Sequence, residues 1–419
     1  MAFIFVTYWW VVPHKFRAGY LLIASIAYFT YNYPPHAILL GALTLLVYGL
    51  GRLMISLRDR MTKAEAEAPS PTEQTDTVAS SSEPAVAADT KLASLKHSYK
   101  MTLVAGLVIC ALFLCYYKYS PMLVASWNSI AKSVDPDATF PVPKLLVPIG
   151  ISFFTFEFIH YLTDLYFGRV KRGSFFDFSL FAFFFPSLVS GPIKRYQIFQ
   201  EQTENLKGFQ THYLSEGLHR IVIGLAKKIV IADTAHLFTV ALNDPSHSSR
   251  LSLWIAMYAY AVKIYYDFSG YTDIAIGCAQ LLGYRLPENF NRPYRQRNLS
   301  VFWNNWHMSL SSWIRDYLFF PLGGSRVGKL RTLFNLTIVM SICGLWHGAN
   351  WNFLVWGLWH GLGLALLRVY GETIGKRVPD SRWVRWAGTA LTIQFVCIGW
   401  VLFASPDLPT ALTSFRRML

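Results

Sequence analysis

Long apolar runs recur along this 419-residue chain, and they limit what it can fold into. Many of them approach the roughly 20 residues that a helix needs to cross a bilayer, a length that soluble cores rarely require. The composition agrees, because 53% of the residues are hydrophobic and only 15% are charged, against roughly 25% charged in an average soluble domain. We therefore predict an all-α, polytopic integral membrane protein.

The apolar runs predict about nine to eleven transmembrane helices, with further re-entrant or interfacial helices. Several runs are short or interrupted by glycine and proline, and non-helical backbone at membrane depth is tolerated only inside protein or beside a wet cavity. We therefore expect a cavity within the bilayer. The candidate spans lie near residues 1–12, 18–31, 37–57, 101–117, 145–167, 175–189, 218–241, 251–268, 271–282, 333–345, 351–367 and 386–403.

Three regions are predicted: N-terminal transmembrane helices in residues 1–58, a linker in 59–98 and a membrane core in 99–419. Most of the linker lacks aromatic side chains and is rich in alanine, serine, threonine, proline and glutamate, a composition typical of disorder. Basic residues beside a span favour the cytoplasm, so we expect a disordered, acidic, cytoplasmic linker. The basic residues that precede it are Arg52, Arg58 and Arg60.

The formal net charge is +14 although the linker is acidic, so the membrane core is strongly basic. A basic core suits contact with the anionic headgroups of a lipid bilayer and, at a site, with an anionic substrate. Nucleic acid is not expected as a partner, because the basic residues flank apolar runs and no recognised nucleic-acid module occurs.

No metal site is predicted. The five cysteines are scattered through apolar segments without a CxxC pair, so they indicate neither a disulfide framework nor a thiolate zinc site. We expect these cysteines to be small residues buried in the packing. GxSxG, Walker, GxGxxG and HExxH motifs are also missing from the sequence, which removes the usual support for esterase, P-loop, Rossmann and zincin chemistry. The cysteines are Cys110, Cys115, Cys278, Cys343 and Cys397.

The densest polar and aromatic sequence lies in residues 267–361, which contain seven of the fourteen tryptophans. Tryptophans alone also fit an interfacial aromatic belt, but a belt does not explain why His307 and His347 lie in the same stretches. An ionisable residue in a membrane segment is costly and is a functional-site hypothesis by default. Histidine suits proton transfer at neutral pH, since its unperturbed pKa is about 6.5.

His347 has apolar neighbours in the sequence, where desolvation is expected to keep its imidazole neutral and able to accept a proton. Flanking Gly344 and Gly348 allow another backbone or a narrow ligand to come close. The alternative for both histidines is a structural role, as polar side chains that bond across helices. For His307 the polar neighbours in the sequence favour this alternative slightly.

Residues 292–322 are too polar to span a bilayer and too aromatic to lie free in water, so we predict interfacial or re-entrant helices. Their arginines are expected either to pair with lipid phosphates or to hold the phosphates of a cytosolic donor through bidentate contacts. Arg315 and Asp316 point about 100° apart on a helix and need not pair. The candidate substrate- or donor-binding residues are Trp306, Asn304, Arg295, Arg297, Arg315, Asp316, Trp346 and Asn350.

Three weaker patterns carry ionisable residues. Lys194 and Arg195 end a broken helix and are interpreted as membrane-edge anchors, and Asp267 and Asp273 are interpreted as helix-end groups. A polar stripe along one helical face favours interhelix hydrogen bonding, with a proton path or metal site as the alternative. The stripe consists of Glu157, His160, Tyr161 and Asp164.

Six motifs together resemble the membrane-bound O-acyltransferase family, specifically its bacterial branch that contains alginate O-acetylase and the D-alanyl transferase of teichoic acids. The resemblance covers residues 145–370, and the PENFNRPY and PLGG variants are more similar to the polysaccharide O-acetylases. In chain order the motifs are VPIGISFFTFEFIHYLTDLYFG, FPSLVSGPIKRY, DFSGYTDIAIG, RLPENFNRPY, WHMSLSSWIRDYLFFPLGG and GLWHGANWNFLVWG.

The resemblance implies a central tunnel lined by His307 and His347, with His347 as the catalytic base. His307 would orient the acyl group or stabilise the developing oxyanion. The implied donor is a cytosolic thioester, either acetyl-CoA or an acylated carrier protein, and no bound cofactor is implied. The acceptor would stand on the other side of the membrane.

We therefore predict an O-acetyltransferase of the bacterial inner membrane that serves a cell-envelope or secreted polysaccharide. A separate extracytoplasmic protein is expected to accept the acyl group. One alternative is D-alanyl transfer from a carrier protein to teichoic acid. Another is a polytopic transporter or flippase of an envelope precursor, in which the two histidines would only line a polar path.

Overall fold

The computed structural model describes residues 1–67, 82–135 and 138–419, and the regular structure of these ranges is helical with no strand. The predicted all-α class is confirmed. Four helical stretches of the described chain are long and apolar enough to cross a membrane, as a multi-pass membrane protein requires. They are Pro34–Ala66, Asp89–Ala131, Trp351–Glu372 and Arg382–Ala404. The larger predicted number of spans stays a prediction.

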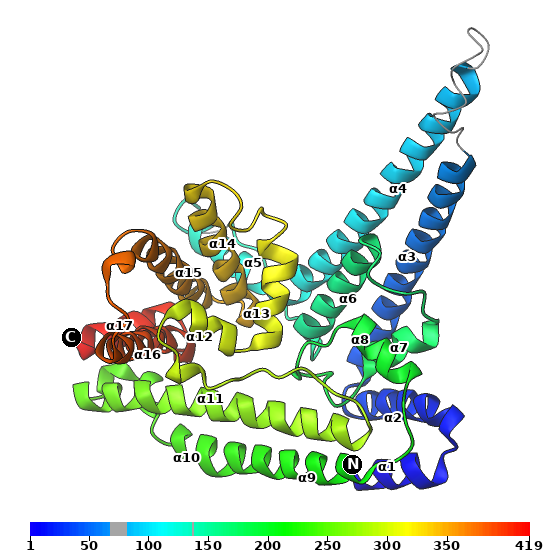
Figure 1. The fold of residues 1–419 in the computed structure, drawn as a ribbon. Coiled ribbons are helices and arrows are strands. Elements are labelled where there is room, and N and C mark those ends of the chain that lie inside the picture. The colour runs from blue at the N-terminus through cyan, green and yellow to red at the C-terminus, as the bar shows by residue number, and fades with distance from the viewer. Residues whose placement is uncertain (68–81, 136–137) are drawn as a thin grey trace.

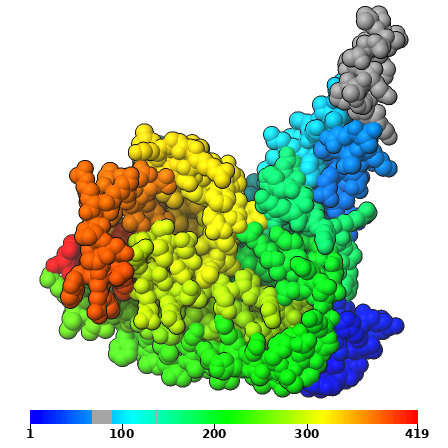
Figure 2. All heavy atoms as spheres, in the orientation of Figure 1, coloured from blue at the N-terminus to red at the C-terminus, as the bar shows by residue number. Residues whose placement is uncertain are grey.

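The first half of the fold packs around a hydrophobic cluster that includes Phe154, Phe178 and Tyr196. Helices α3 and α4 form a long hairpin that projects from the body of the molecule (Figure 1), and the space-filling view shows the same projection (Figure 2). The hairpin packs on α6, which begins beside the site described below. The helices are α1 (Ala2–Val6), α2 (Arg17–Asn32), α3 (Pro34–Glu67), α4 (Ser82–Leu114), α5 (Ser120–Ala131), α6 (Ile151–Tyr166), α7 (Phe175–Phe183) and α8 (Tyr196–Glu204).

The second half packs around a cluster rich in buried tryptophans, among them Trp306, Trp346 and Trp400. Helices α9 and α11 run side by side along one edge of the molecule, and α14 packs against α15 (Figure 1). The helices are α9 (Thr211–Leu225), α10 (Asp233–His236), α11 (Arg250–Leu281), α12 (Leu299–Asn305), α13 (Met308–Ile314), α14 (Lys329–His347), α15 (Trp351–Glu372), α16 (Arg382–Ala404) and α17 (Leu408–Met418).

Helix α11 corrects the prediction of two separate spans at 251–268 and 271–282, because it is continuous across them. Gly270 lies where the break was expected, but it serves packing. A Cβ on Gly270 would lie 2.7 Å from the carbonyl oxygen of Gly224 on α9. The small residue therefore lets the two backbones meet while α11 stays intact.

The predicted linker, residues 59–98, is helical at both of its described ends, which corrects the prediction of disorder there. Helix α3 continues to Glu67 and α4 begins at Ser82, while residues 68–81 lie outside the described residues. Alanine, glutamate and lysine are strong helix formers. The two helices also meet, with the Nζ of Lys96 3.3 Å from a carboxylate oxygen of Glu65. The cytoplasmic location of the linker stays a prediction.

Candidate active site

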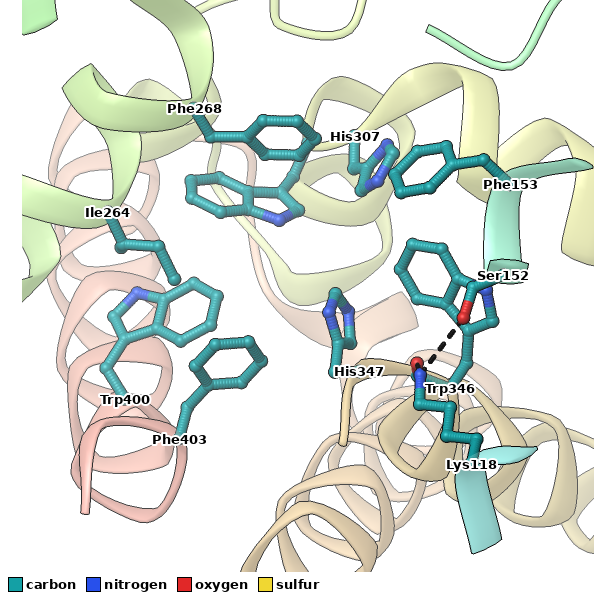
Figure 3. A pocket seen from close by; sticks show the side chains of 11 residues that line it. Lys118, Ser152, Phe153, Ile264, Phe268, His307, Trp346, His347, Trp400 and Phe403 are labelled. Carbon is teal, nitrogen blue, oxygen red and sulfur yellow. Dashed lines mark hydrogen bonds between the residues drawn. The ribbon is translucent and has the colours of Figure 1, made fainter. Parts of the chain in front are cut away.

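His307 and His347 line the same cavity, which has a volume of about 300 Å³. Figure 3 shows both imidazoles at this cavity, with Trp400 and Phe403 on one side and Lys118 and Ser152 on the other. The fold therefore brings together the two histidines that the sequence singled out. The rest of the lining is apolar or aromatic: Phe153, Ile264, Phe268, Trp306, Trp346, Trp400 and Phe403.

His307 occupies the sharp turn between α12 and α13, in a left-handed backbone conformation with a φ of 45°. This conformation is uncommon for a residue other than glycine and costs about 1–3 kcal/mol. Neighbouring contacts must therefore hold the turn. The ring of His307 packs edge-on against Phe268, with 4.6 Å between the ring centroids, and the side chain is 1% exposed.

Asn289 of the PENF motif holds this turn. Its backbone carbonyl accepts a hydrogen bond from the N–H of Met308 at 2.9 Å. Its side-chain oxygen accepts two more, from the N–H of Ser309 at 3.1 Å and from the Ser309 hydroxyl at 2.6 Å. Sequence alone did not indicate that Asn289 positions His307, although both lie in motifs of the same polar and aromatic region.

His347 is the last residue of α14. Its ring contacts Trp356 and Phe403, with centroid separations of 5.3 Å and 5.0 Å. Trp346 lies beside both imidazoles, 4.8 Å from the ring of His347 and 5.9 Å from that of His307. Aromatic rings therefore flank both catalytic candidates at the cavity.

The glycines that flank His347 allow a close approach, as expected, and the approaching group is α15. A Cβ on Gly344 would lie 2.1 Å from the carbonyl oxygen of Phe353, and one on Gly348 would lie 2.1 Å from the Phe353 ring. The tight packing of α15 fixes the end of α14. The orientation of His347 therefore depends on these two glycines.

The tryptophans of residues 267–361 do not form an interfacial belt. Trp303, Trp306, Trp313, Trp346 and Trp356 are all less than 10% exposed, whereas Trp351 is 45% exposed. The buried rings pack against one another, against Phe302 and against His347, mostly edge to face, and this corrects the belt interpretation for most of the cluster. Trp400, from α16, packs against Trp306 and belongs to the same buried cluster.

Lys118 and Ser152 also line the cavity, although the sequence did not single them out. The Nζ of Lys118 donates hydrogen bonds to the Oγ of Ser152, at 3.1 Å, and to the backbone carbonyl of Trp346. One sequence feature could have indicated Lys118, because it lies close to the end of an apolar run and ionisable residues at membrane depth mark functional sites.

The predicted donor-binding residues divide among several places. Trp306 and Trp346 line the histidine cavity. Asn304 and Arg315 line a neighbouring cavity of about 190 Å³. Arg295 borders another cavity, of about 430 Å³. The structure therefore does not gather these residues into a single donor site.

The other predicted donor-binding residues make structural contacts. An Arg297 nitrogen lies 3.9 Å from a carboxylate oxygen of Asp380. Asn350 caps α15, because its side-chain oxygen accepts from the N–H of Trp351 at 2.7 Å. Arg315 and Asp316 do contact each other, with the Nε of Arg315 donating to the carboxylate at 3.0 Å. They lie in a π-helical turn, Arg315–Phe319, rather than in a regular α-helix.

Hydrogen bonds join the polar stripe of α6 to other elements, which confirms the favoured interpretation. Glu157 pairs with Lys194 at 2.7 Å, and the Nε2 of His160 accepts from the N–H of Tyr196 at 3.2 Å. Asp164 accepts from the hydroxyl of Tyr317 at 2.8 Å. Within the described parts of the chain, no group of three or more metal-ligating side chains is placed to hold a metal ion.

Lys194 and Arg195 are not membrane-edge anchors. The Lys194 side chain is 3% exposed and pairs with Glu157, because a buried ammonium requires a counter-ion. Arg195 donates to Asp316 at 2.6 Å and to the hydroxyl of Tyr317 at 2.6 Å. Lys194 therefore binds α6, and the adjacent Arg195 binds the polar and aromatic region.

Asp267 and Asp273 are not helix-end groups either, because both lie inside α11. Asp273 pairs with Arg220 and Lys227, each at 2.6 Å, and these ion pairs tie α11 to the segment that contains α9.

The cysteines are free thiols, and Cys110, Cys343 and Cys397 are buried as expected. Cys115 is exposed, which corrects the packing role predicted for it.

Comparisons with known proteins agree with the fold and with the motifs. The probable alginate O-acetylase AlgI of Pseudomonas aeruginosa is 38% identical over 323 residues, which cover 75% of this chain and 60% of the relative. The peptidoglycan O-acetyltransferase of Helicobacter pylori is 34% identical over 353 residues, covering 77% and 66%. The teichoic acid D-alanyltransferase of Bacillus subtilis is 30% identical over 283 residues, covering 64% and 71%.

The matched segment spans about 60% of the length of the alginate O-acetylases. The model of the membrane-bound O-acyltransferase family matches residues 84–405, which include α6, Lys118, Ser152 and both cavity histidines. The chain belongs to the membrane-bound O-acyltransferase family.

Proposed function

We propose that this chain is an O-acyltransferase of a bacterial inner membrane. It moves an acetyl group from a cytosolic thioester to a hydroxyl, for a cell-envelope or secreted polysaccharide. The observation that supports this is a cavity lined by two imidazoles and several aromatic rings, with His307 buried and His347 partly exposed, in a member of an acyltransferase family. Imidazoles that line such a cavity suit the proton transfer that acyl transfer to a hydroxyl needs.

In the proposed mechanism His347 is the base. The acceptor hydroxyl oxygen attacks the thioester carbonyl carbon while its proton passes to His347. The tetrahedral intermediate then collapses, the carbon–sulfur bond breaks, and the leaving thiolate takes the proton from the imidazolium. His307 orients the acyl group or stabilises the oxyanion. The strained backbone at His307 supports this role, because strain of this kind is concentrated at functional sites.

Acetyl-CoA or an acylated carrier protein is the proposed donor. Arg292 and Arg295 border the cavity of about 430 Å³, where they suit the phosphates that both donors carry. Tyr294, which lines that cavity, accepts a hydrogen bond at its hydroxyl from the Nε1 of Trp400, which lines the histidine cavity, at 3.0 Å. A separate extracytoplasmic protein is proposed to accept the acyl group.

D-alanyl transfer from a carrier protein to teichoic acid is the second candidate. It is favoured by the match to the teichoic acid D-alanyltransferases, which at 30% identity is weaker than the 38–41% to the alginate O-acetylases. A transporter or flippase is a third possibility, in which His307 and His347 would line a path and no thioester would be consumed.

The test measures acyl transfer from radiolabelled acetyl-CoA in membranes that carry the wild-type chain, His347→Ala or His307→Ala. Expression and monodispersity in detergent are matched among the variants. Wild type is expected to consume acetyl-CoA, and His347→Ala to be inactive while folded. If wild type uses only a D-alanylated carrier protein, D-alanyl transfer replaces acetylation. If His347→Ala keeps full activity, the proposed mechanism is wrong for either donor.

A further inference from the structure

A lysine and a serine that the proposed mechanism does not use contact each other at the histidine cavity. The Nζ of Lys118 lies 3.1 Å from the Oγ of Ser152. Figure 3 shows this pair at the cavity wall, beside Trp346 and across from Trp400 and Phe403. A serine activated by a lysine is one of the constellations that catalyse acyl transfer on unrelated folds.

Ser152 lies where the backbone favours negative charge. It belongs to the first turn of α6, directly after Gly150, whose φ of 78° makes a tight turn. A Cβ on Gly150 would lie 2.7 Å from the carbonyl oxygen of Leu188, so a larger residue does not fit there. The helix dipole is positive at this end, although the N–H groups of Ile151 and Phe153 already donate to the carbonyls of Pro148 and Gly150, at 3.1 Å and 2.8 Å. An oxyanion formed on a group attached to Ser152 would lie at this positive end.

Lys118 is placed to act on Ser152. Among the described residues its Nζ forms no ion pair with a carboxylate, and its two hydrogen bonds go to Ser152 and to the backbone carbonyl of Trp346. The carbonyl holds the amine in place, so that the amine faces the serine hydroxyl. Lys118 also lies in a π-helical turn, Cys115–Tyr119, and turns of this kind are frequent at functional sites.

We propose that Ser152 carries the acyl group as a covalent ester during transfer, with Lys118 as the base that activates it. This inference rests on the proposed acyltransferase function and divides its single attack on the thioester into two steps, so that the acceptor attacks the acyl-serine instead of the thioester. In the first step the amine of Lys118 is neutral, and its lone pair accepts from the Ser152 hydroxyl, the reverse of the donation in the structure. The Oγ of Ser152 then bonds to the thioester carbonyl carbon while the hydroxyl proton passes to this amine. The carbon–sulfur bond breaks and the thiolate takes that proton, which leaves an acyl-serine and a free thiol.

In the second step the acceptor hydroxyl attacks the acyl-serine, and its proton passes to His347. The ester bond to Ser152 breaks, and the serine oxygen takes the proton from the imidazolium, which restores both side chains. Donor and acceptor then occupy the cavity one after the other. A cavity of about 300 Å³ therefore needs to hold only one of them at a time.

The alternative role for Lys118 and Ser152 is a structural clamp, because their hydrogen bonds join the π-helical turn, α6 and the end of α14. A clamp predicts a loss of thermal stability in variants and no covalent intermediate. An acyl-serine predicts an ester that can be trapped on the folded protein.

The test uses the full chain purified in detergent, with radiolabelled acetyl-CoA as the probe. The variant His347→Gln is expected to release about one equivalent of CoA thiol per chain in a burst and to retain the acetyl label, because only the second step is blocked. Peptide mass spectrometry after an acid quench is expected to find the acetyl group on the peptide that contains Ser152. This measurement needs no change at Ser152, so it does not depend on whether Ser152 variants fold.

Variants of Lys118 and Ser152 then distinguish a catalytic role of the pair from a structural clamp. Combined with His347→Gln, Ser152→Ala is expected to abolish the label, and Ser341→Ala to retain it, because Ser341 is another buried serine and bonds only the carbonyl of Thr337. Lys118→Met and Lys118→Arg are both expected to slow labelling by about 100-fold, since neither residue can act as the base.

Two results would overturn the inference in distinguishable ways. If Ser152→Ala transfers acetyl groups at the wild-type rate, or if the label maps to another residue, the acyl-serine is wrong and the acyltransferase stands. If the wild-type chain transfers no acetyl group, the proposed function fails and the acyl-serine fails with it.

Discussion

The pentapeptide Gly-Leu-Trp-His-Gly occurs twice in this chain, at residues 344–348 and 357–361, and its two histidines have different surroundings. His347 ends α14 and lines the cavity with His307. His360 lies inside α15, has no exposed surface and does not line that cavity. Neither ring nitrogen of His360 has a hydrogen-bond partner among the described residues.

This difference shows that the pentapeptide alone does not decide whether its histidine lines the cavity. The first glycines of the two copies, Gly344 and Gly357, pack against each other where α14 crosses α15. The two copies therefore lie side by side, and one helix ends after its histidine while the other continues. His347, at the end of its helix, lines the cavity, whereas His360, inside a helix that continues, does not.

The largest effect is expected from exchanging each histidine for glutamine in turn. His347→Gln should lower acyl transfer by about 10²–10⁴-fold, because the base is lost, whereas His360→Gln should stay within a few-fold of wild type. Initial rates of transfer in membranes with matched protein amounts check this. Equal losses in both variants would show that the two copies do not differ in function.

Asn289→Ala should lower transfer by about 10–10²-fold, because a reactive group that moves by about 1 Å can lose that much rate. Asn289 holds the turn at His307 through three hydrogen bonds. The matched control is Asn291→Ala, a nearby exposed asparagine. Rates for the two variants at equal protein amounts test whether His307 needs its strained turn. An Asn289→Ala rate equal to the control rate would contradict this.

Gly344→Ala should destabilise the protein by about 1–3 kcal/mol, as overpacking a tight contact does. The added Cβ would lie 2.1 Å from the carbonyl oxygen of Phe353. Gly41→Ala in α3 is the control, since its added Cβ would meet no atom within 4 Å. Thermal unfolding in detergent compares the two. Equal melting temperatures would show that the contact between α14 and α15 adjusts at no cost.

His360→Leu should raise the melting temperature slightly, because a buried polar group without a hydrogen-bond partner costs about 1–3 kcal/mol and the new side chain has a similar volume. Its acyl transfer should stay within a few-fold of wild type. Unfolding in detergent and transfer rates, measured on the same preparation, check both statements. A lower melting temperature together with lost activity would indicate that His360 supports the site.

Much of the fold was predictable from composition and spacing. Apolar runs predicted an all-α membrane protein, since the bilayer leaves helices as the simplest way to satisfy backbone groups. The two histidines were also predictable, because an ionisable residue is rare in such segments. The roles predicted for four ionisable residues were wrong, because the residues that they pair with lie far away in the sequence. These four are Asp267, Asp273, Lys194 and Arg195.

The sequence by itself determined the helical class, the family and the identity of the paired histidines. Each of these depends on residues that are close along the chain, either in an apolar run or in a motif. The tertiary structure alone decided that Asn289 holds the turn at His307, that Lys118 meets Ser152, and that His347 rather than His360 faces the cavity. Those contacts join residues from different helices, so their geometry follows from how the helices pack and end rather than from any local pattern.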